Sequence, residues 1–378
     1  MNQLTMLLLS LAGVLMGNTS SLASASIDTP LAPKRPQEPT PPFPYHAEDV
    51  TYDNASVGIE LAGTLTTPYG SGPFPAAIMI TGSGQQDRNE GVFGHKPFLV
   101  IADHLTRKGI AVLRVDDRGI GGSTTIGPEG AATSFDFASD VEAGISFLLK
   151  RPRIDPTKIG LIGHSEGGMI APIVAARDPR VAFIVLLAGP GIPIVELLHL
   201  QTEALLRADA ASDDDIAVAM EHDRQVLQIV MDTSLSLEAV TPKIQELMQA
   251  DPSLNGMTKI EKHKAIEHMA KKISTPWFRT FARYDPGPAL VGVRCPVLAV
   301  NGELDCNVTC QENLIGISLA LAQGGNTDVT IRAFPGLNHA FQHCQTGAIE
   351  EIAQLEETIS AEVLNVVADW ITSRFIKE

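Results

Sequence analysis

The sequence predicts an α/β protein in which helices cover both faces of a mostly parallel β-sheet and a helical insertion interrupts the chain. Three observations support this. Apolar and helical segments alternate from residue 48 onward, several apolar segments are hydrophobic along their whole length, and residues 190–290 carry helical stretches without a convincing strand. Strands that are apolar throughout are typical of parallel sheets buried on both faces. A length of 378 residues suits one domain with an insertion.

The composition excludes several classes of protein. A hydrophobic content of 44% and a charged content of 19% indicate an ordinary globular core rather than a disordered chain. The formal net charge of −16 repels nucleic acid and anionic membranes, so neither is an expected partner. The oligomeric state does not follow from the sequence.

The first 47 residues are expected to lie outside the fold. Residues 1–25 resemble a signal peptide, because Met6 to Met16 is an apolar run too short for a bilayer and Ala23-Ser24-Ala25 is a cleavage pattern. No Lys or Arg lies in residues 1–5, so an uncleaved anchor is the alternative. Residues 26–47 contain seven prolines and are predicted to be a linker. We therefore expect an exported protein, periplasmic or secreted, with no stable membrane span after cleavage.

The core is predicted to comprise residues 48–189 and 291–378. Its first half begins with an antiparallel pair, and its helices end at breakers such as Gly109 or carry one apolar face, as residues 135–150 do. The predicted strands are 49–54, 58–68, 75–84, 110–119, 158–163, 181–189, 296–305 and 328–336. The predicted helices of the core are 98–108, 135–150, 166–177, one from Gln311, and 361–376. Those of the insertion, residues 190–290, are 196–210, 213–231, 237–250 and 259–273.

The stretch Gly163-His164-Ser165-Glu166-Gly167 stands between a buried strand and a helix. A serine on such a sharp turn takes a strained backbone, so its neighbours must be small, which explains the glycines on either side. The turn exposes the hydroxyl at the carboxyl edge of the sheet and at a helix N-terminus, where a developing negative charge is stabilised. This context predicts that Ser165 is a nucleophile.

A serine nucleophile needs a base and an acid that orients the base. On this type of turn the chain order is serine, acid, histidine. His339 follows the strand 328–336 directly, and His343 is the alternative base. Asp305 lies at the end of the strand 296–305, with Glu303 as the alternative acid. Thr309 and Glu312 are predicted to form a capping box for the next helix, which leaves Asp305 available.

The tetrahedral intermediate of acyl transfer needs two N–H donors. The backbone amide of Glu166 is one candidate, and the amide of Ser83, in the loop "TGSGQQDRNEG", is the other. A phosphate-binding loop is the rival interpretation of this glycine-rich segment. It lacks the lysine and the spacing that such a loop requires.

Together these segments resemble the α/β-hydrolase fold, most closely secreted bacterial serine esterases. The matching motifs are "TGSGQQDRNE", "LRVDDRGIGGS", "IGLIGHSEGG", "VNGELD" and "GLNHAFQ", within about residues 75–345. The resemblance implies Ser165 as nucleophile, Asp305 as acid and His339 as base, and a structural role for the loop Asp117 to Gly119. Thr81-Gly82 stands where many members have His-Gly.

The predicted activity is hydrolysis of small-molecule carboxylic esters with a small acyl group, without a cofactor or metal. A serine peptidase acting on small peptides is the alternative, and a binding protein that retains the fold is a third. The insertion is expected to roof the catalytic residues, with the acyl pocket lined by cap residues. The candidates for that lining are Leu197, Leu198, Met220 and Phe278, although most of these apolar residues are expected simply to pack the cap. A disulfide from Cys344 to Cys306, or to Cys310, is expected to tie the acid and base loops together.

Overall fold

The computed structural model describes residues 34–249, 254 and 257–376. The predicted signal peptide, residues 1–25, lies outside the described residues. The described part of the predicted linker contacts the body of the protein. The Arg35 guanidinium donates to the carbonyl oxygen of Leu355 at 2.7 Å, and the Gln37 amide donates to that of Ile359 at 2.7 Å. In the part of the chain that the structure describes, no helix is both long and apolar enough to span a membrane.

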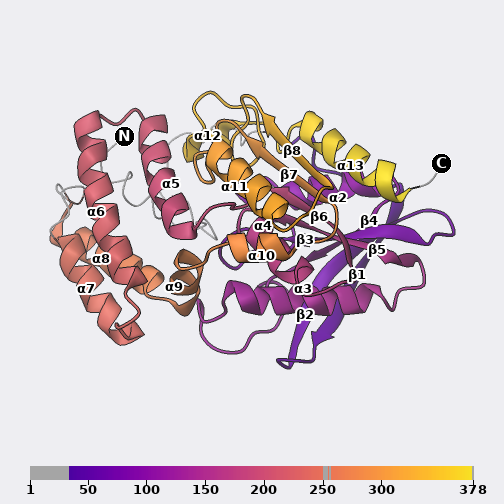
Figure 1. The fold of residues 1–378 in the computed structure, drawn as a ribbon, viewed down its shortest axis with the longest axis horizontal. Helices are drawn as coiled ribbons and strands as arrows, with labels where there is room; N and C mark the ends of the chain where they lie inside the picture. The colour runs from indigo at the N-terminus through magenta and orange to yellow at the C-terminus, as the bar shows by residue number, and fades with distance from the viewer. Residues whose placement is uncertain (1–33, 250–253, 255–256, 377–378) are drawn as a thin grey trace.

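Eight strands form one sheet in the order β1-β2-β4-β3-β5-β6-β7-β8 (Figure 1). β2 pairs antiparallel with β1 and with β4, whereas all the other pairings are parallel. The α/β class and the mostly parallel sheet predicted from the apolar segments are therefore confirmed. The strands are β1 (Tyr45–Asn54), β2 (Ile59–Pro68), β3 (Phe74–Ile80), β4 (Ala111–Val115), β5 (Ile154–His164), β6 (Val181–Leu187), β7 (Val297–Gly302) and β8 (Val329–Phe334). β1 begins at Tyr45, two residues before the predicted end of the linker.

Helices cover both faces of the sheet, so successive strand residues are buried on opposite sides. In β5, Leu161 packs with the helices of one face and Ile162 with those of the other, and neither is exposed. One face is covered by α2 (Pro97–Arg107) and α13 (Ala361–Phe375). The other is covered by α3 (Ser134–Leu148), α4 (Glu166–Ala175), α10 (Gly287–Gly292) and α11 (Cys310–Gln323).

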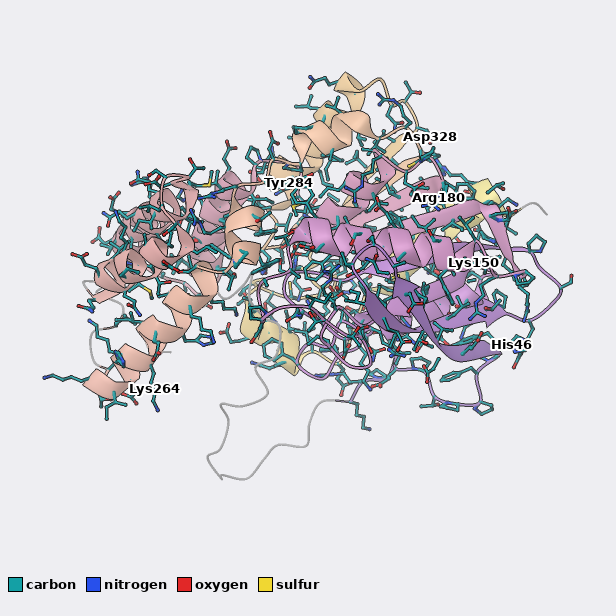
Figure 2. The ribbon with its side chains drawn as sticks, turned by 90° about the horizontal axis from the view of Figure 1, so that it is seen from below. His46, Lys150, Arg180, Lys264, Tyr284 and Asp328 are labelled. Atoms are coloured by element: carbon teal, nitrogen blue, oxygen red, sulfur yellow. The ribbon has the colours of Figure 1, made fainter. Side chains whose placement is uncertain are left out.

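The insertion forms a helical cap beside the sheet. Figure 1 shows α5 to α8 grouped apart from the core, with α9 between the two, and Figure 2 shows Lys264 of α8 at the far tip of the cap. The cap helices are α5 (Ile194–Ala208), α6 (Asp213–Met231), α7 (Leu237–Gln249), α8 (Lys259–Ile273) and α9 (Pro276–Ala282). Buried apolar residues such as Val230, Ile244 and Met269 pack the cap internally.

Three short helices in the described part of the chain were not predicted from the sequence. α9, of seven residues, is the last cap helix, and α10, of six residues, lies between it and β7, while α12 (Ile349–Gln354) follows the loop after β8. A helix of fewer than two turns contains too few residues to show the helical repeat of apolar positions. One of them, α12, contributes to the wall of the main cavity described below.

Candidate active site

Ser165 occupies the sharp turn that the glycines predict. Its backbone dihedrals are φ 52° and ψ −118°, a region that a residue with a Cβ rarely adopts, and α4 begins at the next residue. A Cβ on Gly163 would lie 2.0 Å from the carbonyl oxygen of Gly167, and one on Gly167 would lie 2.1 Å from that of Ile80. Both positions must therefore be glycine. The Ser165 amide donates to the carbonyl oxygen of Leu187 at 2.9 Å, which holds the turn.

Asp305 and His339 meet at the same edge of the sheet, after β7 and β8. His339 Nδ1 lies 2.8 Å from Asp305 Oδ2. Asp305 Oδ1 accepts the backbone N–H groups of Asn307 and Val308, each at 2.8 Å. The Asp305 side chain is fully buried, and that of His339 is 16% exposed. These bonds orient the carboxylate and fix one edge of the imidazole ring.

The alternative base and acid lie elsewhere. The His343 side chain is 66% exposed, and its Nδ1 lies 2.8 Å from Glu357 Oε2. Glu303 is exposed. The structure corrects the predicted capping box: α11 does follow Thr309, but the Thr309 side chain makes no capping hydrogen bond. The support for Asp305 as the residue that orients His339 is therefore its hydrogen bonding to His339, Asn307 and Val308, not the predicted capping box.

Ser165 and His339 line one cavity of about 100 Å³. The apolar wall comes from the loop before α2, from α2 itself, and from the region around α12. Its residues include Val92, Phe93, Pro97, Phe98, Ile101, Leu187, Phe341, Ile349, Ile352 and Ile359. The polar lining comprises Ser83, Gln86, Glu90, His164, Ser165, Asn307 and His339. No cap residue is among the described residues that line this cavity, which corrects the expectation that the cap forms the main pocket.

The cap instead borders a much smaller cavity on the other side of Ser165. It measures about 20 Å³, and its lining residues are Ser83, Ser165, Pro190, Leu197, Gln201, Phe281, Asn307 and Val308. Of the four predicted lining residues only Leu197 is there. Phe278 and Leu198 are buried in the apolar cluster that joins the cap to one face of the sheet, and neither lines either of these cavities. Met220 is half-buried on α6, away from both cavities.

The side chain of Glu166 joins the Ser165 turn to the cap. Ser134 Oγ donates to Glu166 Oε1 at 2.5 Å, and the indole N–H of Trp277, from α9, donates to the same oxygen at 3.0 Å. Burial raises the pKa of the Glu166 carboxyl to about 7, against the hydrogen bonds from Ser134, Trp277 and Ser83. The structure thus brings Ser83 and Glu166, the two predicted sources of oxyanion donors, into contact.

Glu90 and His164, which no sequence pattern singled out as functional, also line the main cavity. His164 Nδ1 lies 2.9 Å from Glu90 Oε1, and His164 Nε2 lies 3.0 Å from the carbonyl oxygen of His339. The amide of Gly82 donates to the same Glu90 oxygen at 2.6 Å. A histidine next to a nucleophile was the available signal, but its partners lie 74 and 175 residues away in the chain.

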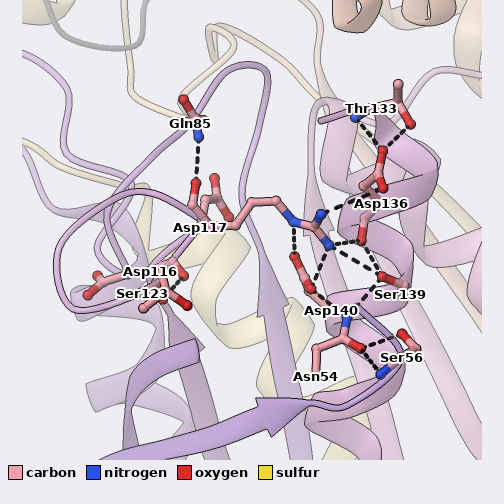
Figure 3. A network of polar contacts seen from close by, with 12 residues as sticks. Asn54, Ser56, Gln85, Asp116, Asp117, Ser123, Thr133, Asp136, Ser139 and Asp140 are labelled. Carbon is pink, nitrogen blue, oxygen red and sulfur yellow. Dashed lines mark hydrogen bonds and ion pairs between the residues drawn. The ribbon is translucent and has the colours of Figure 1, made fainter. Parts of the chain in front are cut away.

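The loop after β4 makes the structural contacts that the resemblance implies. Thr81 Oγ1 donates to Asp117, which also accepts the Gln86 amide, so this carboxyl supports the loop of Ser83. Burial raises the pKa of Asp117 to about 8. Arg118 Nε donates to Asp140 Oδ2 at 2.7 Å. Figure 3 shows the loop of Asp117 beside Asp136, Ser139 and Asp140 of α3, which Arg118 contacts.

The predicted disulfide is absent, because all four cysteines of the chain are free. Cys306 Sγ points toward the carbonyl oxygens of Leu304 and Thr346, at 3.7 and 3.8 Å. Cys344 Sγ points toward that of Gly336, at 3.7 Å. Each thiol is directed at a backbone carbonyl rather than at the other sulfur.

Comparison with known proteins agrees with this architecture. Residues 96–343 match the family described as serine aminopeptidase, S33. Esterase EstD of Thermotoga maritima is 24% identical over 332 residues, which cover 87% of this chain and 68% of that protein. The α/β-hydrolase GrgF of Penicillium sp. sh18 superposes with a TM-score of 0.54 at 18% identity, over 88% of this chain and all of that one. The Pyrococcus furiosus esterase Pf2001 superposes with a TM-score of 0.52 at 14% identity, over 88% and 92% of the two chains.

Proposed function

The chain belongs to the serine aminopeptidase S33 family of α/β-hydrolases, and from this premise we propose that it is a serine hydrolase of carboxylic esters with a small acyl group. The observation that carries the proposal is the geometry around one cavity. Ser165 on its strained turn and His339 with its bond to Asp305 both face that cavity. A curated relative, EstD of Thermotoga maritima, is named an esterase.

The proposed reaction divides hydrolysis into two acyl transfers. His339 accepts the hydroxyl proton of Ser165 while Oγ forms a bond to the ester carbonyl carbon. The backbone N–H groups of Ser83 and Glu166 stabilise the oxyanion, and His339 returns the proton to the departing alcohol. Water then attacks the acyl-enzyme with His339 again as base, which releases the acid and restores Ser165. Asp305 holds His339 in the required tautomer and orientation throughout.

The apolar cavity favours esters over peptides with a free amino terminus. An aminopeptidase must hold a charged ammonium group, which requires an available carboxylate near the nucleophile. Among the described residues that line the two cavities, Glu90 is the sole carboxylate, and it is engaged by His164 and Gly82. The alternative of a peptidase retains support from the family's own description.

Replacing the nucleophile tests the proposal directly. Ser165→Ala should lower kcat for p-nitrophenyl acetate by about a millionfold, because serine is needed to form the acyl-enzyme. The melting temperature should change little, since Ser165 borders a cavity. The exposed Ser373→Ala on α13 is the control and should keep the parental rate. A Ser165→Ala protein that hydrolyses the ester at the parental rate would contradict the proposal, and parental activity on aminoacyl amides rather than esters would favour the peptidase.

A further inference from the structure

His164, the residue before the nucleophile, bridges two other parts of the active site. One ring nitrogen faces Glu90 at 2.9 Å and the other faces the carbonyl oxygen of His339 at 3.0 Å. The His164 ring also lies against the His339 ring, with 4.6 Å between the centroids. The bridge therefore acts on the main chain of the predicted base, immediately beside its imidazole.

The partners determine the protons that His164 carries. A carbonyl oxygen only accepts hydrogen bonds, so Nε2 must carry a proton toward His339. With Glu90 ionised, its Oε1 accepts both the Gly82 N–H and a second bond from Nδ1. An imidazole that donates from both nitrogens is the imidazolium cation. Charge-assisted bonds of this kind are stronger than neutral ones.

Glu90 is held in place at a conformational cost. Its side chain is 6% exposed, and its backbone φ is 53°, a value that residues with a Cβ rarely adopt. Such strain persists where the surrounding structure fixes it, often near functional sites. A Cβ on its partner Gly82 would lie 3.3 Å from the Cβ of Ser165, so the segment that Glu90 holds directly adjoins the nucleophile.

We propose that Glu90 and His164 form a buried ion pair that positions the catalytic machinery, linking the loop of the oxyanion donor Ser83 to the loop of the base His339. The chain of contacts runs from the Gly82 amide to Glu90, from Glu90 to His164, and from His164 to the His339 carbonyl. This inference rests on the proposed function. Glu90 and His164 are positioning residues, because neither is required to exchange a proton with the substrate.

The pair makes catalysis depend on the second proton of His164. Burial lowers the pKa of His164, but the Glu90 carboxylate and the bonds to Glu90 and His339 outweigh it, together with Asp305, so the pKa lies above the ordinary 6.5. The groups that act on the protonation of the ring are thus Glu90, the carbonyl oxygen of His339 and, through its charge, Asp305, and the His339 ring lies against it. The positioning contribution is complete below the His164 pKa and is lost as pH rises through it.

A second His–Glu pair provides a matched control. His343 Nδ1 lies 2.8 Å from Glu357 Oε2, only four residues beyond His339, but His343 is 66% exposed. An exposed pair contributes little because water screens it. Glu90→Gln and Glu357→Gln remove the same charge while keeping a similar shape, so they separate the buried pair from a general effect of charge.

The two variants are compared by kcat, KM, melting temperature and pH profile with p-nitrophenyl acetate. Glu90→Gln should lower kcat by roughly tenfold or more with KM within about twofold, since a misplacement of about 1 Å can cost about 100-fold. The alkaline loss of kcat should move to lower pH in Glu90→Gln and stay in place in Glu357→Gln. Parental kcat in Glu90→Gln, or an alkaline limb that does not move, would overturn the proposal.

A titration of the parent protein tests the ion pair even if Glu90→Gln fails to fold. The ring nitrogens of ¹⁵N-labelled histidines are followed by NMR, with the His164 signals assigned through His164→Gln. A midpoint above 6.5 for His164 is expected, and a midpoint at or below 6.5 would overturn the proposal. Ser165→Ala separates the two hypotheses: an active Ser165→Ala protein contradicts the proposed function, whereas an inactive one beside an unimpaired Glu90→Gln protein contradicts only the ion pair.

Discussion

The two sides of Ser165 are built from different parts of the molecule. On one side, loops and helices of the core enclose a cavity of about 100 Å³ that also contains His339. On the other, α5 and α9 of the cap leave a cavity of about 20 Å³. The cap also reaches the nucleophile turn through the bond from Trp277 to Glu166. Under the proposed function, the core therefore supplies the catalytic groups and the larger binding cavity, while the cap holds the Ser165 turn and borders the smaller cavity.

The strongest test of this comparison removes one buried group from each side. Asp305→Asn should lower kcat by about 10⁴-fold, because the amide favours the wrong tautomer of His339. Gln201→Ala, at a buried cap position beside Ser165, should lower kcat by less than about tenfold, since the proposed mechanism gives Gln201 no role. Both are measured as initial rates with p-nitrophenyl acetate. A larger loss in Gln201→Ala than in Asp305→Asn would reverse the assignment of chemistry to the core.

The next largest effect is a change in stability with pH, and it concerns the hydrogen bond between Trp277 of the cap and Glu166 beside the Ser165 turn. Because burial raises the Glu166 pKa from 4.5 to about 7, the folded state keeps a proton that the unfolded state has lost over that range. Stability should therefore fall as pH rises from about 4.5 to 7, by at most about 3 kcal/mol for this group. Glu166→Gln removes this dependence and keeps an acceptor for Trp277. Its stability relative to the parent should be higher at pH 8 than at pH 5.

Urea unfolding of both proteins at the two pH values measures this difference. Asp117, whose pKa burial raises to about 8, adds a slope of the same sign in both proteins, so it largely cancels in the comparison. If the difference between variant and parent is the same at pH 5 and pH 8, the buried Glu166 carboxyl does not titrate as described.

The smallest expected effect is a change in acyl-chain preference, and it distinguishes the wall of the core-side cavity from the cap-side wall of the smaller cavity. Ile352→Trp should fill the core-side cavity and shift the ratio of kcat/KM for butyryl over acetyl esters toward acetyl by about tenfold, since each methylene in an apolar pocket is worth roughly 1–3 kcal/mol. Leu197→Trp, the same substitution on the cap side, should change that ratio by less than about threefold. If Leu197→Trp shifts the ratio and Ile352→Trp does not, the acyl group occupies the cap side and the comparison is wrong.

Local patterns were sufficient to predict the framework of the site. The buried strands are apolar along their length, and the glycines around Ser165 are required by carbonyl oxygens about 2 Å from where a Cβ would lie. Asp305 and His339 each follow a strand whose carboxyl end lies at the same edge of the sheet. Such features depend on a few neighbouring residues and on the fact that the carboxyl ends of parallel strands lie at the same edge, so they can be predicted without a structure.

The parts that the sequence did not reveal depend on contacts between distant segments. The wall of the main cavity combines residues near Phe93 with residues near Ile352, and the Glu90–His164 pair spans 74 residues. Leu198 and Phe278 have the apolar character of pocket residues, but they are buried in the apolar cluster shared by the cap and the sheet and line neither cavity. The apolar character of a residue predicts that it is buried, but the residues that it packs against become known only from the fold.

The bond between Trp277 and Glu166 also gives the protein an internal optical reporter. The chain contains two tryptophans, and the second, Trp370, donates to Thr330 on the opposite face of the sheet. In a Trp370→Phe background the tryptophan fluorescence therefore comes from Trp277, whose indole nitrogen lies 3.0 Å from the carboxyl oxygen of Glu166, the residue after Ser165. The emission of Trp277 would report changes in the contact between the cap and Glu166 during turnover, without an added label.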